Sequence, residues 1–157
     1  MNIIDKKISG LGLTLPDPAA PVANYSPYVI SGNLVFISGQ ISKVGDEMIG
    51  GRLGEDLTVE KGRQAAKLSA LNLLAQMKAA CDGDLSRVKR IVRLGGFVQA
   101  LPMVTEADIP KIINGCSDLM VEIFGDEGQH ARSAVSSPSL PLDVAVEIDA
   151  VVEIVAS

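Results

Sequence analysis

Residues 131–154, with the sequence ARSAVSSPSLPLDVAVEIDAVVEI, decide the fold that we predict for this chain. In the second half of this stretch apolar and acidic residues alternate, as in a β-strand that is covered on one face. The first half, residues 131–136, is a shorter strand-like run, and two prolines break the ladder between the runs. We therefore predict a hairpin that places Arg132 roughly opposite Glu147, so that a guanidinium contacts a carboxylate. The apolar face of the second strand would consist of Val144, Val146, Ile148, Ala150, Val152 and Ile154.

Four segments of the chain match one known pattern. They are Ser26-Pro27-Tyr28, Ser38-Gly39-Gln40-Ile41, the single residue Asn114, and Arg132-Ser133-x-Val135 followed by Leu140-Pro141-x-Asp143-Val144-x-Val146-Glu147. Together they resemble the RidA family, which is also called YjgF or endoribonuclease L-PSP. The spacing from the arginine to Leu-Pro and on to the glutamate is kept without a gap, and the resemblance runs from about Tyr25 to the C-terminus.

The composition indicates one soluble, acidic domain. The chain has 157 residues, a formal charge of −5 and only 3% aromatic residues, which disfavours binding to nucleic acid. Neither an apolar stretch long enough for a membrane nor a secretory signal is present. Cys81 and Cys116 belong to no CxxC pair, which predicts reduced thiols and a cytoplasmic protein. We expect residues 1–23 to form an extended leader packed on a single domain of residues 24–157, although a short helix or strand is possible at its start.

Hydrophobic periodicity places the remaining elements. Strands are expected at 28–30, 34–41 and 87–99. One helix should begin after Thr58 as the N-cap and end near 82–84. A second helix has two possible starts, a capping box at Thr105 or a cap at Asp108, and we prefer Asp108 because Pro110 then lies in the first turn.

This order predicts an α+β fold, a mixed sheet with two helices on one face. The other face, with Ala145 and Val151 among its acids, is too apolar to remain uncovered, so we expect association with other copies. The resemblance implies the chorismate-mutase-like RidA fold and a homotrimer whose pockets lie between subunits.

The resemblance also implies roles for individual side chains. Arg132 would hold a substrate carboxylate with its planar fork, which a lysine could not reproduce. Glu147 would position and activate a water molecule. Five further residues would bind substrate: Tyr28, Ser38, Gly39, Asn114 and Ser133.

The chain departs from the family at two of these segments. Ala134 stands where many members have a cysteine, so chemistry that needs a thiol there is excluded. Ser26 replaces a glycine, which suggests a divergent branch. His130 is the only histidine, which excludes a metal site with several imidazoles, and a lone loop histidine is usually structural or solvent-facing. No nucleotide-binding motif follows a strand, and we expect no cofactor.

We therefore predict a cofactor-independent deaminase of reactive imines and enamines such as 2-aminoacrylate and 2-iminopropanoate, which releases a 2-keto acid and ammonia. A trimer that binds or senses small carboxylates without turnover is the alternative. A ribonuclease is the least favoured function, because the chain lacks a basic groove studded with aromatic residues.

Overall fold

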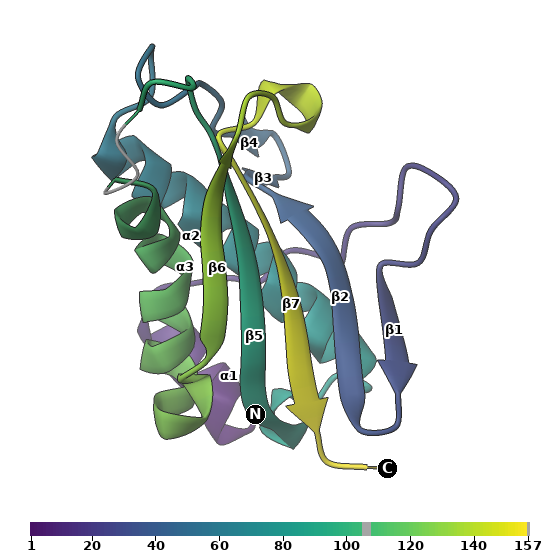
Figure 1. Ribbon diagram of the computed structural model, residues 1–157. Helices are drawn as coiled ribbons and strands as arrows, with labels where there is room; N and C mark the ends of the chain where they lie inside the picture. Colours follow the sequence, from purple (N-terminus) through teal and green to yellow (C-terminus); the bar gives the residue numbers. More distant parts are fainter. Residues whose placement is uncertain (105–107, 157) are drawn as a thin grey trace.

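The computed structural model describes residues 1–104 and 108–156. Within them two long helices, α2 and α3, lie against one face of a five-stranded sheet (Figure 1). The predicted α+β fold class is thereby confirmed. The elements are α1 (Ile3–Gly10), β1 (Tyr28–Ser31), β2 (Leu34–Ile41), β3 (Lys43–Val44), β4 (Glu47–Met48), α2 (Val59–Ala80), β5 (Val88–Gln99), α3 (Asp108–Phe124), β6 (Ala131–Ser137) and β7 (Val146–Ile154), with short 3-10 turns at Leu85–Arg87, Gly125–Gly128 and Pro141–Asp143.

The strand order is β1-β2-β7-β5-β6, so the predicted hairpin of β6 and β7 is wrong. β5 lies between them, parallel to β6 and antiparallel to β7. The physical reason is burial. β5 is mostly buried, which suits a central strand with neighbours on both sides, whereas the serine-rich β6 is largely exposed and suits an edge. Arg132 is consequently paired with Leu94, and Glu147 with Phe97.

α2 begins where the sequence predicts. The Thr58 side chain accepts a hydrogen bond from the backbone N–H of Lys61, 3.1 Å away, as an N-cap should. The helix then packs closely on α3, because Gly62 leaves space that the Ile112 side chain fills. The predicted apolar stripe is buried throughout: Ala66, Ala70, Leu73, Leu74 and Met77.

α3 begins at Asp108, with Pro110 in its first turn as predicted. The alternative start at Thr105 lies outside the described residues. Cys116 is fully buried in the core, and burial raises the pKa of its thiol to about 12. Among the described residues, no helix combines the length and hydropathy needed to cross a membrane.

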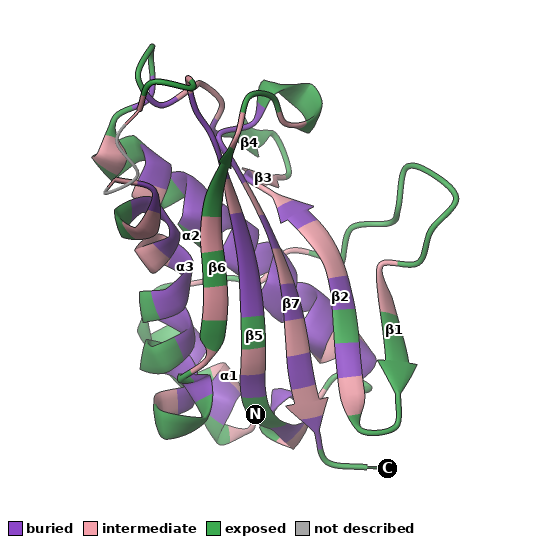
Figure 2. Ribbon diagram, viewed as in Figure 1, coloured by how far each residue is buried: buried purple, intermediate pink, exposed green. Residues whose placement is uncertain are grey.

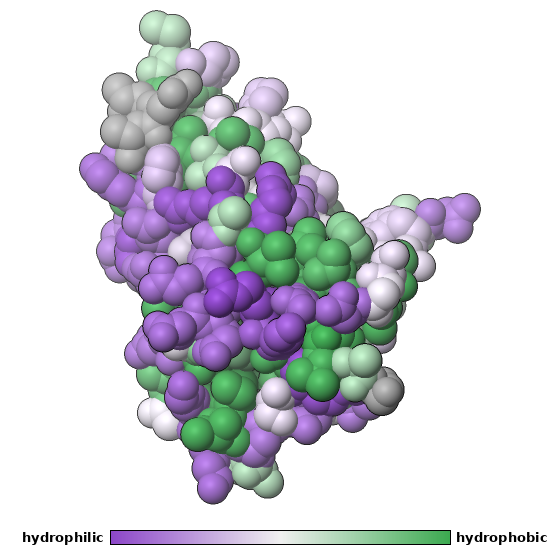
Figure 3. All heavy atoms as spheres, turned by 60° about the horizontal axis from the view of Figure 1, so that its bottom comes forward, coloured by the Kyte–Doolittle hydropathy of each residue, from purple (hydrophilic) through white to green (hydrophobic). Residues whose placement is uncertain are grey.

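The start of the leader is helical rather than extended. α1 buries Ile4 and Ile8 against the domain, and Asn2 caps it by accepting from the Asp5 backbone N–H at 2.8 Å. An ion pair of 2.9 Å between Asp5 and Lys78 ties it to α2. Figure 3, turned toward this end of the molecule, shows hydrophobic patches separated by hydrophilic side chains. The domain division near residue 23 stays a prediction.

No helix of residues 1–104 and 108–156 lies against the other face of the sheet, and Figure 2 shows how burial alternates along β7. Apolar side chains are exposed on this uncovered face: Val29 at 55%, Phe36 at 46% and Val135 at 46%. Phe36 lies between Val29 and Val151 in the strand register. Ala145 was expected on the same face, but it is fully buried and precedes β7, so that prediction is wrong.

Ser69 is a buried polar residue whose hydroxyl has no hydrogen-bond partner among the residues that the structure describes. Because an unsatisfied buried hydroxyl is costly, we expect Ser69→Ala to raise the free energy of unfolding by about 1 kcal/mol. Denaturant titration measures this change. Ser42→Ala is the matched control: its buried hydroxyl donates to Ile49 O and accepts from Val146 N, so this variant should be less stable than wild type. If both variants lost the same free energy of unfolding, the Ser69 hydroxyl could not be an unsatisfied group.

Candidate functional site

Arg132 is half-buried on β6 and points toward α3. Its Nη1 donates to Ser117 Oγ at 3.0 Å, and its Nη2 donates to the Pro110 carbonyl at 3.3 Å. Both acceptors are neutral, and no ion pair with a carboxylate joins Arg132 within the described residues. A guanidinium has five N–H donors, so these two bonds leave three for a ligand. The side chain is thus oriented while its charge stays uncompensated.

Asn114 lies in the same neighbourhood as Arg132. It is half-buried on α3, four residues after Pro110 and three before Ser117, so helical spacing places it on the same flank as both Arg132 contacts. His130 approaches Ser117 from the chain just before β6, with Nε2 2.8 Å from Ser117 Oγ. We call this group the arginine half-site: Arg132, Asn114, Ser117 and His130.

Glu147 lies on the opposite, uncovered face of the sheet, since its neighbours Val146 and Ile148 are fully buried beneath it. Its carboxylate rests on Gly39 of β2, where a Cβ atom would come within 2.8 Å of Glu147 Oε1. Asp149 rests in the same way on Gly95 of β5. We call this group the glutamate half-site: Gly39, Glu147 and Asp149.

Burial perturbs both of these acids, and a neighbouring charge perturbs each of them further. Burial raises the pKa of Glu147, and the neighbouring Asp149 carboxylate raises it further. Burial also raises the pKa of Asp149, while Arg93 and the Gly95 backbone N–H oppose that rise. Arg93 lies 3.6 Å from Asp149 and also donates to Ser133 Oγ at 3.3 Å. Ser133 therefore faces Arg93 and Asp149, away from its neighbour Arg132.

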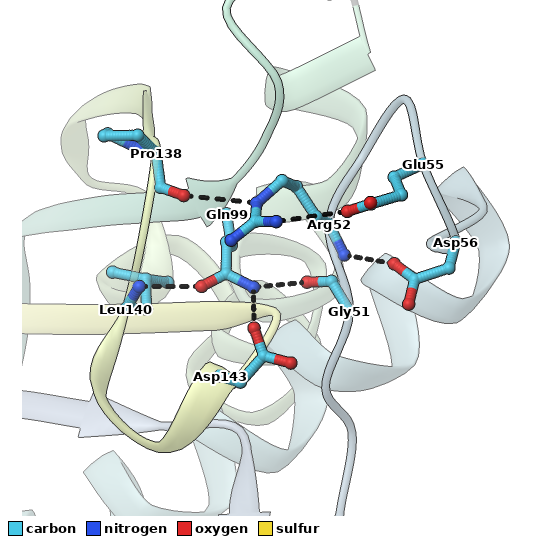
Figure 4. Close-up of polar contacts among 8 residues, drawn as sticks. All are labelled: Gly51, Arg52, Glu55, Asp56, Gln99, Pro138, Leu140 and Asp143. Atoms are coloured by element: carbon cyan, nitrogen blue, oxygen red, sulfur yellow. Dashed lines mark hydrogen bonds and ion pairs between the residues drawn. The ribbon is translucent and has the colours of Figure 1, made fainter.

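The loop from β6 to β7 passes around the end of β5 and is fixed there by Gln99 (Figure 4). The Gln99 side chain is fully buried. Its Nε2 donates to Gly51 O at 3.0 Å and to Asp143 Oδ1 at 2.7 Å, and its Oε1 accepts from Leu140 N at 2.7 Å. Arg52 Nε adds a bond of 3.2 Å to the Pro138 carbonyl. These contacts set the entry of β7, on which Glu147 lies.

The structure thus divides the predicted site residues between two places. Arg132 and Asn114 come together at the β6 edge, while Glu147 and Gly39 come together on the uncovered face. β6 and β7 are two strand spacings apart, about 10 Å, so the predicted contact between Arg132 and Glu147 within one chain is wrong.

Two further predicted residues lie near β1. Tyr28, on β1, is partly buried against the core and is paired with Ile37, which is buried on the helix side. The Ser38 hydroxyl donates to the Ser26 carbonyl at 2.7 Å. Neither residue contacts Arg132 through a hydrogen bond in the described chain. The arginine half-site is thus built on β6 and α3, and Glu147 and Gly39 are built on β7 and β2.

Comparison with known proteins agrees with this architecture. The family model described as "YjgF/chorismate_mutase-like, putative endoribonuclease" matches residues 5–154. The chain belongs to this family. The resemblance to RidA proteins is thereby confirmed, and the matched range includes most of the leader.

Three relatives illustrate the range of similarity. Protein TCP17 of Trypanosoma cruzi is 49% identical over 147 residues, which cover 92% of this chain and 89% of the relative. A crystal structure of an Agrobacterium tumefaciens protein of unknown function superimposes with a TM-score of 0.89 at 43% identity, covering 98% of this chain and 94% of the other. A 2-iminobutanoate/2-iminopropanoate deaminase of Dermatophagoides farinae is 27% identical over 144 residues, 90% of this chain and 94% of the relative.

Four polar residues around the site were not predicted from sequence: Arg93, Ser117, His130 and Asp149. Asp149 could have been predicted from the sequence, since it lies two residues after Glu147 and therefore shares its face of the strand. The contact between Ser117 and His130 could not have been predicted from the sequence, because it depends on how α3 packs beside β6. Among residues 1–104 and 108–156, no three His, Cys, Asp or Glu side chains are grouped as metal ligands.

Gly39 should tolerate no side chain, because the Glu147 carboxylate occupies the space. We expect Gly39→Ala to lower the free energy of unfolding by about 1–3 kcal/mol, as overpacking commonly does. Gly10→Ala is the control, since a Cβ there meets no atom within 4 Å. Chemical denaturation compares the two, and equal stability would show that the carboxylate moves aside freely.

The raised pKa of Glu147 predicts a pH dependence of stability. Above the ordinary value of 4.5 the unfolded chain has released a proton that the folded chain still binds, so the contribution of Glu147 lowers the free energy of unfolding as the pH rises toward the folded pKa. Glu147→Gln has no titrating carboxyl group at this position and so lacks this pH-dependent contribution to stability. We expect its stability relative to wild type to increase above pH 4.5. Denaturation at fixed protein concentration measures it, and a difference independent of pH would contradict the shift.

Proposed function

We propose that this protein is a hydrolytic deaminase of 2-imino and enamine acids, of the 2-aminoacrylate and 2-iminopropanoate type, that works without a cofactor. It would form a homotrimer with its sites between subunits. The observation that carries the proposal is the state of Arg132: a half-buried guanidinium that neutral groups orient and no carboxylate neutralises. Such a fork suits the carboxylate of a small acid.

The separation of the two half-sites supports assembly. Each half is incomplete alone, because the cation has no acid and the raised-pKa acids face solvent on the other side of the sheet. If the β6 edge of one copy docks on the uncovered face of the next, a head-to-tail contact forms that can close as a ring. The exposed Val29, Phe36 and Val135 on that face favour burial. The opposite charges of the two half-sites favour the same contact.

In the assembled site, Arg132 would hold the substrate carboxylate and orient the imine carbon. Glu147 of the neighbouring copy would accept a proton from water as the water oxygen attacks that carbon. Glu147 returns this proton to the nitrogen of the tetrahedral intermediate. The hydroxyl proton of the intermediate is then transferred to the same nitrogen as the carbonyl forms, so that ammonia leaves and the 2-keto acid remains. A raised pKa makes Glu147 a stronger base than an ordinary carboxylate, which suits it for taking and returning this proton. Imines already hydrolyse in water, so orientation supplies much of the required acceleration.

The proposal also assigns roles to the remaining predicted site residues and a cellular compartment to the protein. Tyr28 and the backbone near Gly39 would shape the pocket, and Asn114 and Ser133 would line it. The two buried free thiols, Cys81 and Cys116, fit a reducing compartment, and we place the protein in the cytoplasm.

The test couples the protein to an amino-acid dehydratase or oxidase that generates the imine, and follows release of ammonia and keto acid. The proposal predicts faster release with wild type than with Arg132→Ala. Equal rates would reject the deaminase. Binding of 2-oxobutanoate that Arg132→Ala abolishes, without any turnover, would select a binding or sensing trimer instead.

A further inference from the structure

Ser117, His130 and Arg132 form one chain of hydrogen bonds that ends at the proposed anion fork. His130 Nδ1 lies 2.6 Å from the Gly128 carbonyl, and its Nε2 lies 2.8 Å from Ser117 Oγ. Ser117 Oγ in turn accepts from Arg132 Nη1 at 3.0 Å. Ser117 is 9% exposed, so water competes little for its hydroxyl.

The chemistry of the partners fixes the direction of these bonds. A carbonyl oxygen can only accept, so His130 Nδ1 must carry a hydrogen and donate it to Gly128. In the neutral ring Nε2 then has a free lone pair, and the Ser117 hydroxyl donates to it. The hydroxyl hydrogen is therefore turned away from Arg132, and the oxygen lone pairs face the guanidinium.

Such an arrangement orients a long cationic side chain without neutralising it. An arginine loses considerable rotamer freedom when it is fixed, so a group that holds it in advance reduces the cost of ligand binding. A carboxylate in the place of Ser117 would also hold it, but would compete with an anionic substrate. The Pro110 carbonyl, 3.3 Å from Nη2, provides the second neutral acceptor.

We propose that Ser117 and His130 are positioning residues that hold the Arg132 fork in its ligand-binding orientation, with His130 setting the direction of the Ser117 hydroxyl. This inference rests on the proposed function only for the identity of the anion. The orientation of Arg132 can be measured without any ligand.

The first test is NMR of protein labelled with ¹⁵N-arginine, in which the Arg132 Nη1–H signal, from the group that donates to Ser117, is assigned by its loss in Arg132→Lys. We expect Ser117→Ala to raise the hydrogen-exchange rate of this group about tenfold, as expected for loss of a hydrogen bond to a charged group. Ser117→Thr, which keeps a hydroxyl, should restore slow exchange. Ser69→Ala is the control for removing a buried serine hydroxyl on a helix, and should leave the Arg132 signal unchanged.

A matched pair of variants tests His130. A glutamine amide reaches the place of Nε2 and can accept from Ser117, whereas an asparagine amide reaches only the place of Nδ1. We expect His130→Gln to keep slow exchange at Arg132 and His130→Asn to raise it about threefold, a partial loss of one hydrogen bond. Unchanged exchange in both Ser117→Ala and His130→Asn would overturn the positioning role.

The kinetic readout separates this inference from the deaminase proposal. If Ser117 acts through Arg132, Ser117→Ala should raise KM about tenfold with a smaller change in kcat, and should cause no further loss in an Arg132→Ala background. An additive loss in that background would contradict action through Arg132. Wild-type protein with an ordered Arg132 signal but no ammonia release would reject the deaminase and leave the positioning role intact.

Discussion

Arg132→Ala is expected to lower kcat/KM for a 2-imino acid by about a hundredfold or more, since truncating one partner of a buried charged pair costs about 3 kcal/mol. The loss should fall mainly on KM, because the fork holds the carboxylate in the ground state as well as in the transition state. Arg132→Lys should recover little, since an ammonium offers no planar fork and cannot reach both Ser117 and Pro110 in the same way. Steady-state assays of ammonia release measure both variants.

Arg90→Ala supplies the control for loss of an arginine. Arg90 is exposed on β5 and is paired in the register with Glu153, away from the arginine half-site. It should keep wild-type kinetics. A wild-type KM in Arg132→Lys would contradict recognition by a bidentate fork.

Glu147→Gln is expected to lower kcat by about a hundredfold or more and to leave KM nearly unchanged, because general acid–base groups typically contribute factors of this size. The glutamine keeps the shape of the side chain over Gly39 but cannot take a proton from water. The measurement is kcat from the same coupled assay, with trimer formation checked by light scattering.

Glu153→Gln is the matched control on the same strand. Glu153 also lies on the uncovered face, but it forms a surface ion pair of 2.9 Å with Lys89, and the Asn33 side-chain amide donates to it at 3.0 Å. Its replacement should leave kcat unchanged. An equal fall in kcat for both variants would point to the charge of the face rather than to a catalytic base at Glu147.

Much of the fold follows from local sequence. The alternation in β7 gives the strand and its buried face, Thr58 marks the start of α2, and Pro110 lies in the first turn of α3. These features depend on neighbours within a few residues, which periodicity and capping rules describe well. The order of the elements predicted the α+β class, and the family resemblance supplied the roles of the candidate site residues.

The prediction of strand pairing was wrong, because pairing depends on contacts between segments that are far apart in the sequence. Two strand-like runs with a proline-containing loop between them suggested a hairpin. In the structure β5 lies between β6 and β7, and the loop that connects β6 to β7 passes the end of β5. Gln99, the last residue of β5, holds that loop, and nothing in the run itself signals such a contact. β5 separates Arg132 from Glu147, and the register places them on opposite faces, since Arg132 pairs with Leu94 and Glu147 pairs with Phe97, three residues further along β5.

Because Arg132 and Glu147 lie on opposite faces of the sheet, the proposed site depends on assembly more strongly than the sequence indicated. A hairpin would have placed both groups in one subunit, where assembly only closes the pocket. With the half-sites on opposite faces, one chain can supply the cation and another the base. Exposed apolar residues on the uncovered face and the unneutralised Arg132 at the β6 edge are the two features that such a contact would use.

Subunit complementation tests this claim most directly. Arg132→Ala and Glu147→Gln proteins, each nearly inactive, are mixed in equal amounts, unfolded together and refolded. If each site takes Arg132 from one copy and Glu147 from the next, about a quarter of the sites should be intact, because subunits enter the ring at random. We predict recovery of about a quarter of the wild-type rate of ammonia release. A mixture that stays as inactive as the separate variants, although mixed trimers form, would contradict a site shared between subunits.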